Sequence, residues 1–327
     1  MKRKESEDTR SPATVSIVAT AFNEQENLQA LCDEIRRALE DEYRDLEILI
    51  VDNGSTDQSL DTLKMLRSQD DRIGFVSLSR NFGHQGGLIA GLENCSGDVI
   101  VTMDADLQHP PEVIPQLLDH WKNGIDVVGT IRAQNPNTPR LRRLLNLIFY
   151  AMIRRMMGTQ SPASHSDFRL MDRRALDALL ALPEKDKFLR GLASWIGFRQ
   201  TTVAYTPQRR LAGKSKFAFK HLVAFTLNGI AAFSILPLRL FTAFGLVVAT
   251  GAVLYSLFIL VCALAYGTGS LPPGWATLAV AVSFLGGVQL IGIGILGEYL
   301  GRTLGEVRSR PAYIVSEAST GREKSSP

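Results

Sequence analysis

Two carboxylates and an amide follow an apolar run close to residue 100. In VTMDADLQHPP, residues 101–111, Asp104, Asp106 and Gln108 occupy alternate positions at the end of a run typical of a buried β-strand. If the strand breaks between them, both carboxylates reach one hard divalent cation and Gln108 adds a neutral oxygen. Because Mg²⁺ or Mn²⁺ completes its shell with water and substrate phosphates, this spacing predicts a metal that holds a diphosphate. The alternative, in which Asp106 caps a helix opened by the two prolines, leaves Asp104 unexplained.

Polar residues also follow three other strand-like runs. FNEQEN comes after the first run, DNGSTD after the second and SRNFGHQ after the third. In DNGSTD, Asp52 is a candidate acceptor of hydrogen bonds from a nucleobase or ribose. This motif alone favours a capped turn, in which Gly54 and Ser55 form the turn and Thr56 or Asp57 caps the following helix. Loops at the carboxyl ends of parallel strands meet at the same edge of a sheet, so the four polar endings predict one ligand site.

The elements that must position these residues alternate along the chain. Short β-branched apolar runs predict strands, and segments with helical periodicity lie between them. Such alternation is typical of an α/β fold, in which helices cover a parallel sheet. The expected strands are residues 14–22, 46–52, 73–79, 97–104 and 125–131, and the expected helices are residues 24–42, 57–69, 86–95 and 110–124.

Two long uncharged runs lie near the end of the chain, Leu240–Tyr266 and Trp275–Gly297. Each exceeds the roughly 20 apolar residues that cross a bilayer, so together they predict a transmembrane hairpin. Arg239 precedes the first run and further arginines follow the second, which places both ends of the hairpin in the cytoplasm. The polar N-terminus does not resemble a signal peptide, so the soluble part is expected in the cytosol as well. Three cysteines without metal-ligand spacing fit a reducing compartment.

Positive charge is concentrated ahead of the uncharged runs. The net charge of the chain is +3, but residues 132–220 contain 18 Lys or Arg against 5 Asp or Glu, a local charge of +13. A solvated basic face is one interpretation. The neighbouring apolar runs favour an anionic membrane surface or a phosphate-bearing ligand, and no nucleic-acid partner is expected. Residues 140–158 and 216–240 place basic residues around an apolar body, which predicts interfacial amphipathic helices. The alternative for either segment is a core helix of the soluble domain.

Eight motifs occur in order along the chain: SIVATAFNEQENL, ILIVDNGSTD, SRNFGHQGGLIAGL, DVIVTMDADLQHPPEVIPQLL, DVVGTIR, SDFRLMDRRALDAL, RRLAGKSKF and GIGILGEYLGRTLGEVRSRPAYIV. Together they resemble the family 2 glycosyltransferases that act on polyprenyl phosphate, over about Val15 to Val315. The likeness is nearest to the bactoprenol glucosyltransferases, and the dolichyl-phosphate mannosyltransferases are related. It implies a GT-A (Rossmann-like) fold, a nucleotide-sugar donor and an inverting transfer to the phosphate of a membrane lipid.

The resemblance and the composition together predict a division of the chain. The N-terminal residues form a disordered polar tail, and a cytosolic GT-A catalytic domain follows it. An amphipathic juxtamembrane segment then leads into the two spans, and a cytosolic tail follows them. The expected boundaries are 1–12, 13–215, 216–239, 240–266, 275–298 and 299–327.

The resemblance also implies roles for individual residues. Asp167 falls on the position that the family places near the acceptor as a catalytic base. A carboxylate there repels an incoming phosphate unless it orients a cation, so holding Arg169 or another arginine is an alternative, and an ordinary surface aspartate is a third. Asn53 removes a charge where family members often read VDDGS. The implied sets are catalytic Asp167 and Asp106; nucleotide-binding Asn23, Glu24, Asp52, Arg80 and Asp104; acceptor-binding or phosphate-binding Arg132, Arg209, Arg210, Ser215 and Lys216; and metal-binding Asp104, Asp106 and Gln108.

These expectations describe a multi-pass enzyme of the inner (plasma) membrane with cytoplasmic termini, possessing a Mg²⁺ or Mn²⁺ site. It would move glucose from UDP-glucose to undecaprenyl phosphate for modification of a cell-envelope glycan such as the lipopolysaccharide O-antigen. GDP-mannose or a UDP-aminosugar is an alternative donor. A processive polysaccharide synthase is disfavoured because QRRLAG lacks the tryptophan of the Q-x-x-R-W box. A non-enzymatic scaffold has no need of the metal-binding set, and a homo-oligomer such as a tetramer is a further implication of the resemblance.

Overall fold

The chain divides into two compact units, of which residues 218–309 form the second. The computed structural model describes residues 14–39, 45–132, 166–184, 187–207, 236–266 and 274–320. Several predictions fall outside these residues: the polar tail at 1–12, the amphipathic segments at 140–158 and 216–235, and four of the acceptor-binding residues, Arg209, Arg210, Ser215 and Lys216.

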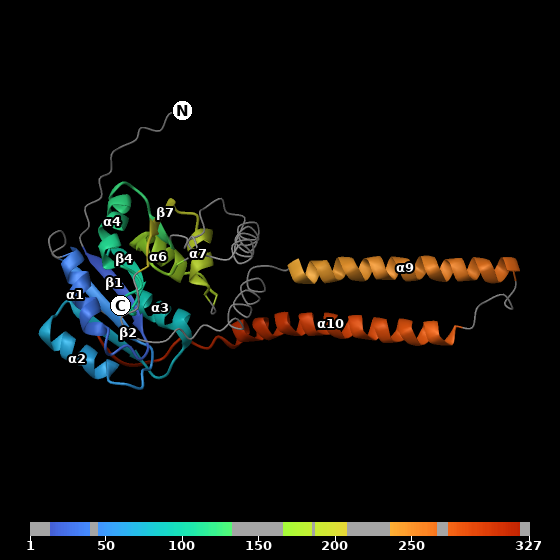
Figure 1. Ribbon diagram of the computed structural model, residues 1–327, viewed down its shortest axis with the longest axis horizontal. Helices are drawn as coiled ribbons and strands as arrows, with labels where there is room; N and C mark the ends of the chain where they lie inside the picture. The colour runs from blue at the N-terminus through green and yellow to red at the C-terminus, as the bar shows by residue number, and fades with distance from the viewer. Residues whose placement is uncertain are drawn as a thin grey trace, which may run out of the picture. The chain divides into compact units, whose positions relative to one another are not determined.

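An eight-stranded sheet forms the centre of the first unit, and its strands lie in the order β7-β5-β6-β4-β1-β2-β3-β8. Figure 1 labels β1, β2, β4 and β7 of this sheet. The five strands expected from the apolar runs are all present, because β-branched runs of this length suit a sheet that is buried on both faces. The strands are β1 (Val15–Ala21), β2 (Leu46–Asp52), β3 (Ile73–Leu78), β4 (Val99–Asp104), β5 (Val127–Arg132), β6 (Arg169–Asp172), β7 (Gln200–Tyr205) and β8 (Val315–Ser319).

The expectation of a wholly parallel sheet is corrected by two strands. β6 lies between β4 and β5 and runs antiparallel to both. β8 pairs antiparallel with β3 at the edge of the sheet, so part of the segment predicted as a C-terminal tail is a strand. These two strands are only four and five residues long, which is too short for apolar periodicity to indicate them. β1 to β5 and β7 nevertheless share one direction, so their carboxyl ends lie at the same edge.

Helices cover both faces of the sheet. α1 (Leu28–Leu39), α2 (Ser59–Gln69) and α4 (Ile114–Lys122), the last preceded by a short 3₁₀ turn at Pro111–Val113, bury apolar side chains against one face. α3 packs on the other face so closely that a Cβ on Gly91 would lie 2.3 Å from Val18 Cγ1. α6 and α7 lie on the same side as α3. The bounds of these three helices are Gly83–Asn94, Arg173–Leu180 and Leu189–Trp195.

The second unit contains two long helices, α9 (Leu236–Tyr266) and α10 (Trp275–Arg308). They pack where Gly292 meets the Phe241 ring, since a Cβ on the glycine would lie 2.3 Å from Phe241 Cε1. Among the residues described here, one segment is long and apolar enough to cross a membrane, Phe284–Arg308, and the apolar run Phe241–Tyr255 of α9 is shorter. The two predicted helices are therefore present, while their role as a pair of membrane spans stays a prediction.

Candidate active site

The polar strand endings meet where β1 to β5 finish, which we call the carboxyl edge. β1 lies between β2 and β4, and its last two residues define the register there. Ala21 pairs with Asp52 of β2, and Thr20 pairs with Asp104 of β4. The two aspartates therefore flank the end of β1, in agreement with the expectation that the polar endings share one place.

The loop after β1 is bound to the DNGSTD turn after β2. Asn23 has a left-handed backbone (φ 57°), its amide oxygen accepts from the Thr56 N–H at 2.8 Å, and its own N–H donates to Ser55 Oγ at 2.9 Å. The Glu24 N–H donates to Ser59 Oγ at 3.1 Å. These bonds give Asn23 and Glu24 a visible part in shaping the carboxyl edge, and their contact with a nucleotide stays a prediction.

Asp52 is buried at the centre of this turn, with 2% of its surface exposed. Its Oδ1 accepts from the Ser55 N–H at 3.0 Å and its Oδ2 accepts from Ser77 Oγ at 2.8 Å. The bond from Ser55 closes the tight turn, and Asp57, one of the two residues predicted to cap the following helix, accepts from the Ser59 N–H at 3.0 Å where α2 begins. A carboxylate oxygen can accept more than one hydrogen bond, so the nucleoside contact predicted for Asp52 stays a prediction.

Asn53 connects the same turn to the start of α3. Its Nδ2 donates to Gly83 O at 2.9 Å and its Oδ1 accepts from the Phe82 N–H at 3.0 Å. An aspartate at this position could accept the second bond but could not donate the first. The asparagine that stands here, where family members often have aspartate, therefore makes a bond that only the amide allows. Close by, Arg80 is exposed and stacks over the Phe82 ring at 4.1 Å, and Gly54 (φ 71°) approaches the Arg80 backbone more closely than a Cβ allows.

β4 ends at Asp104, and the chain then turns so that His109 meets Asp104. Leu107 takes a left-handed conformation (φ 59°), and the buried Asp106 accepts from the Gln108 N–H at 3.1 Å. Asp106 thus caps this turn. It does not cap the following 3₁₀ helix, whose N-cap is Pro110 and has no side-chain hydrogen bond.

His109 holds the turn from inside. Its Nδ1 accepts from the Asp104 N–H at 3.0 Å and lies 3.7 Å from Asp104 Oδ2, and its Nε2 lies 3.2 Å from Ser166 Oγ. The ring stacks on Phe168 with 5.1 Å between centroids. Burial lowers the pKa of His109 despite the nearby Asp104 carboxylate, so the ring is neutral near pH 7 and carries its proton on Nε2.

Arg132 reaches this turn from the end of β5. Its Nη2 donates to Gln108 Oε1 at 3.4 Å, and its Nε donates to the Tyr205 hydroxyl at 3.1 Å. The predicted phosphate-binding arginine therefore lies beside the predicted metal-binding amide. Tyr205, at the end of β7, also lies 3.4 Å from Ser166 Oγ, so two further strand ends contribute to the site.

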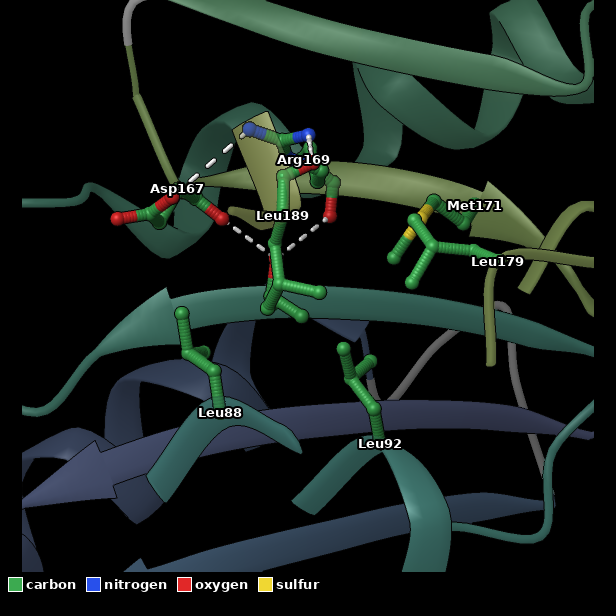
Figure 2. Close-up of a pocket in the computed structure, with 8 residues that line it drawn as sticks. Leu88, Leu92, Asp167, Arg169, Met171, Leu179 and Leu189 are labelled. Atoms are coloured by element: carbon green, nitrogen blue, oxygen red, sulfur yellow. Dashed lines mark hydrogen bonds and ion pairs between the residues drawn. The ribbon is translucent and has the colours of Figure 1, made fainter. Parts of the chain in front are cut away.

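Asp167 is buried, with 3% of its surface exposed, so the interpretation as a surface aspartate is wrong. Arg190 binds it with both arms of its guanidinium, Nε to Oδ1 at 2.8 Å and Nη2 to Oδ2 at 2.6 Å. His84 Nε2 lies 3.0 Å from Oδ2. Figure 2 shows the Arg169 guanidinium between Asp167, at 3.8 Å, and the backbone oxygen of Leu189, at 3.2 Å.

These contacts shift two pKa values in opposite directions. Burial by itself raises the pKa of Asp167, but hydrogen bonds from His84 and Arg190 and the charge of the arginines outweigh it, so the pKa lies far below its usual range. Burial by itself lowers the pKa of His84, but Asp167 and Asp104 outweigh it and raise that pKa. Asp167 is therefore a stable anion and His84 is biased toward its cation.

Neither His84 nor Arg190 was selected from the sequence. His84 belongs to SRNFGHQ, which ends the third strand, so its position at the carboxyl edge was available as a signal. Arg190 lies in α7, outside any motif with recognisable spacing, and no local pattern indicates that it meets Asp167. Only the tertiary structure identifies Arg190 as a residue of this site.

The donor set agrees with a hard divalent cation that is shared with a substrate. Asp104 has 31% of its side chain exposed at the carboxyl edge, and Asp106 and Gln108 follow it within one turn. Within the part of the chain that the structure describes, no group of three or more His, Cys, Asp or Glu side chains is placed to hold a metal. Two carboxylates and one amide oxygen fit Mg²⁺ or Mn²⁺ only when water and phosphate oxygens complete the shell.

Comparison with known proteins places the chain in a family. The model of glycosyl transferase family 2 matches residues 16–180. An uncharacterized glycosyltransferase of Synechocystis sp. is 39% identical over 93% of this chain and 95% of that protein. The SfII prophage-derived bactoprenol glucosyl transferase of Shigella flexneri is 37% identical over 94% of this chain and 99% of that protein.

One solved structure with a related trace is the glucosyl-3-phosphoglycerate synthase of Mycobacterium tuberculosis in complex with Mn²⁺, UDP and phosphoglyceric acid. It is 20% identical, covers 67% of this chain and 76% of that chain, and has a TM-score of 0.48, which is too low to bear on ligands of this protein. The family match and the two relatives are enough by themselves to assign the family. Together with the α/β sheet and its carboxyl edge, they show that the chain belongs to glycosyl transferase family 2 and is a glycosyltransferase of the GT-A-like fold.

Proposed function

We propose that this protein transfers glucose from UDP-glucose to undecaprenyl phosphate at the cytoplasmic face of the membrane, giving a polyprenyl phosphosugar for modification of a cell-envelope glycan such as the O-antigen. The observation that carries the proposal is the group formed by Asp104, Asp106, Gln108 and Arg132. It joins oxygen ligands for a divalent ion to a cation that binds phosphate. A relative named bactoprenol glucosyl transferase, similar over nearly its whole length, supports the acceptor and the sugar.

The proposed division of roles follows the geometry of the carboxyl edge. Asp104, Asp106 and Gln108 hold Mg²⁺ or Mn²⁺, which when bound stabilises the negative charge of the leaving diphosphate. Arg132 binds phosphate beside Gln108. The loops after β1, β2 and β3 bind the nucleoside and its phosphates, and the residues proposed there are Asn23, Glu24, Asp52 and Arg80.

Asp167 is proposed as an orienting group and not as a base. A phosphate monoester is already ionised near pH 7 and needs no proton removed before it attacks. A carboxylate with a pKa far below the usual range is also a poor proton acceptor. Its two bonds to Arg190 and its contact with His84 support a role in positioning cations.

A two-span membrane hairpin is proposed for α9 and α10, with both ends of the pair in the cytoplasm. The connectivity of the chain supports it. β7 precedes the second unit and β8 follows it, and both belong to one sheet. A segment that leaves one side of a membrane and returns to a strand of the same sheet crosses an even number of times. The apolar Phe284–Arg308 therefore needs a partner span, and α9 has the length to provide it.

The test is sugar transfer by the purified full chain. Protein in detergent is incubated with Mg²⁺ or Mn²⁺, undecaprenyl phosphate and each of a panel of labelled nucleotide sugars, and the lipid product is separated and counted. We expect label in a lipid phosphosugar, most of it from UDP-glucose. Label from GDP-mannose or a UDP-aminosugar alone would support the proposed transfer to lipid phosphate but would show that the donor is not UDP-glucose. The absence of labelled lipid with every donor would refute the proposal.

Asp104→Asn is the matched variant for the metal-binding set. Loss of one ligand charge should reduce divalent-dependent transfer by at least about 100-fold, because the metal no longer binds tightly against the diphosphate. Asp98→Asn is the control, since Asp98 immediately precedes the same strand, at the edge opposite the carboxyl edge, where it accepts from the Thr14 N–H. Equal activity of the two variants would contradict the metal assignment and would favour a non-enzymatic role for this set.

A further inference from the structure

The segment that follows α10 contacts the loop after β3, which carries the predicted nucleotide-binding Arg80. Residues 310–319, which we call the return segment, belong to the first unit and end in β8. The N–H of Ser79, the residue immediately before Arg80, donates to Ile314 O at 2.9 Å. This bond extends the pairing of β3 with β8 beyond the last residue of β3. The loop therefore begins against the return segment.

The loop after β3 is held between two parts of the chain. On one side, a Cβ on Gly54 would overlap the Arg80 backbone, so the turn after β2 lies directly against the loop. On the other side, a Cβ on Gly86 of α3 would lie 2.9 Å from Phe82 Cβ and 3.2 Å from Ala312 O. The missing side chain of Gly86 thus lets the loop and the return segment both approach α3 at one point.

Tyr313 anchors the return segment on α3. Its hydroxyl donates to Glu93 Oε2 at 2.7 Å and accepts from Asn94 Nδ2 at 3.3 Å. Burial and the Glu93 carboxylate raise the pKa of Tyr313, so the phenol keeps its proton for this bond. A hydrogen bond to a carboxylate is stronger than one between neutral groups. Since Glu93 lies near the end of α3 and Gly86 near its start, the return segment contacts the helix at both ends.

Phe82 transmits these contacts to Arg80. The Arg80 guanidinium is exposed and stacks over the Phe82 ring at 4.1 Å. A guanidinium that is held over an aromatic ring has a fixed orientation and still offers N–H donors at its edge. Phe82 in turn meets Gly86 beside Ala312, so a shift of the return segment would free the ring on which Arg80 rests.

We propose that the return segment is a positioning element of the nucleotide-sugar site, in which Tyr313 holds the loop after β3 so that Arg80 meets the nucleotide. The inference rests on the proposed function, in which Arg80 binds the nucleotide. Tyr313 acts through the loop and is a positioning residue. Because the return segment follows α10 directly along the chain, the same contacts join the donor site to the end of the second unit.

The experiment measures steady-state constants of the full chain in detergent, with Tyr313→Phe as the variant. Phenylalanine keeps the ring and removes the hydroxyl that binds Glu93. Loss of this anchor should raise the KM for UDP-glucose about 3-fold or more and leave the KM for undecaprenyl phosphate within about 2-fold. Gly86→Ala should have the same effect, because its Cβ forces Phe82 or Ala312 to move.

A double-mutant cycle with Arg80→Gln separates positioning from a general loosening of the fold. If Tyr313 acts through Arg80, Tyr313→Phe raises the KM for UDP-glucose in the unaltered chain and changes it little further once Arg80 is replaced. If Tyr313 only stabilises the fold, the two increases in KM multiply. Binding of UDP in the presence of Mg²⁺ by calorimetry gives the same comparison without turnover.

Lys64→Gln is the matched control. Lys64 of α2 binds Glu317 of β8 at 2.7 Å, so its replacement also removes a contact of the return segment. The two side chains are 43% and 47% exposed, and exposed pairs contribute little. This variant should leave both KM values unchanged.

Two outcomes would overturn the inference. In one, Tyr313→Phe and Gly86→Ala behave as Lys64→Gln does. In the other, they raise the KM for UDP-glucose by the same factor with and without Arg80, or raise both KM values equally. If the transfer assay identifies another donor, that nucleotide sugar and its nucleoside diphosphate replace UDP-glucose and UDP. Failure of the proposed function is distinct, since the unaltered protein would then transfer no sugar, while the comparison of nucleotide binding among the variants would still decide the role of Tyr313.

Discussion

At the scale of single residues, environment decides what each aspartate does. Asp104 is partly exposed at a strand end, with imidazoles 3.7 Å away on two sides, and suits a ligand that comes and goes. Asp52 is buried and its two oxygens bind Ser55 and Ser77. Asp167 is buried among cations. Three residues of one type thus divide into a candidate metal ligand, a turn cap and an orienting group.

Replacing Asp167 by asparagine separates an orienting role from a role as base. The change leaves Arg169, which is 3% exposed as a residue, without its counter-charge, so we expect a loss of about 3–5 kcal/mol in the free energy of unfolding. The unfolding temperature of the full chain in detergent, followed by tryptophan fluorescence, should fall clearly. A variant that loses turnover yet keeps its unfolding temperature would instead indicate a base. Asp177→Ala, which breaks a surface pair with Arg173, serves as the control.

At the scale of elements, short connections hold the carboxyl edge in place. The loop after β1 is stapled to the turn after β2, and Asn53 ties that turn to α3. At the opposite edge of the sheet, where β4 begins, Asp172 caps α6 by accepting from the Arg174 N–H at 3.0 Å. It also accepts from Trp121 Nε1 of α4 at 2.9 Å. One carboxylate therefore joins helices on opposite faces.

The Asp172 cap makes a prediction about pH. Burial opposes its ionisation, but the bonds from Trp121 and Arg174 outweigh burial and lower the pKa of Asp172. In the unfolded chain the pKa is about 3.9, so the stabilisation is complete above that pH and is lost as the pH falls through the lower folded value. Asp172→Ala should therefore destabilise by about 1–2 kcal/mol at pH 7.

The measurement is urea denaturation of both proteins at pH 7 and at pH 3. The difference in free energy of unfolding between them should shrink at pH 3, because the unaltered protein has begun to lose its own contribution from Asp172. A difference that is the same at both pH values would show that the ionised form of Asp172 contributes nothing beyond its packing.

At the scale of the whole molecule, the return of the chain to its first unit is the dominant feature. β8 pairs with β3 after α10, Lys64 binds Glu317 at 2.7 Å across this edge, and the Tyr313 hydroxyl donates to Glu93 of α3 at 2.7 Å. The strand also covers the edge of β3, which would otherwise offer unpaired backbone groups to another chain. Between β7 and β8 the chain therefore leaves the first unit and returns to it.

This closure predicts the accessibility of two engineered cysteines in intact cells. Ser270→Cys lies between α9 and α10 and should react with a membrane-impermeant maleimide from outside. Ser68→Cys, exposed at the end of α2, should react only after the membrane is opened. Both changes are made in a chain whose Cys262 is replaced by serine, and Cys32 and Cys95 are buried. Labelling of both cysteines only after the membrane is opened would contradict the hairpin.

Much of the carboxyl edge was predictable because each piece is local. Asp104, Asp106 and Gln108 follow an apolar run, and a strand followed by polar residues is a pattern within a dozen positions. Arg132, at the end of β5, was indicated by the family resemblance and not by such a pattern. The short strands β6 and β8 were not, since four or five residues contain too little periodicity, and their pairing depends on partners that are distant in the sequence.

The sequence by itself determined the family, the alternation of strands and helices, and the residues offered at the ends of the parallel strands, because these depend on spacing within short segments. Only the tertiary structure decided that Asp167 is buried, that His84 from α3 and Arg190 from α7 meet on it, and that the chain returns to its own sheet after α10. His84 and Arg190 lie 106 positions apart along the chain. Their charges act together because folding brings both within hydrogen-bonding distance of one carboxylate that is shielded from water, where attraction is strong enough to hold them.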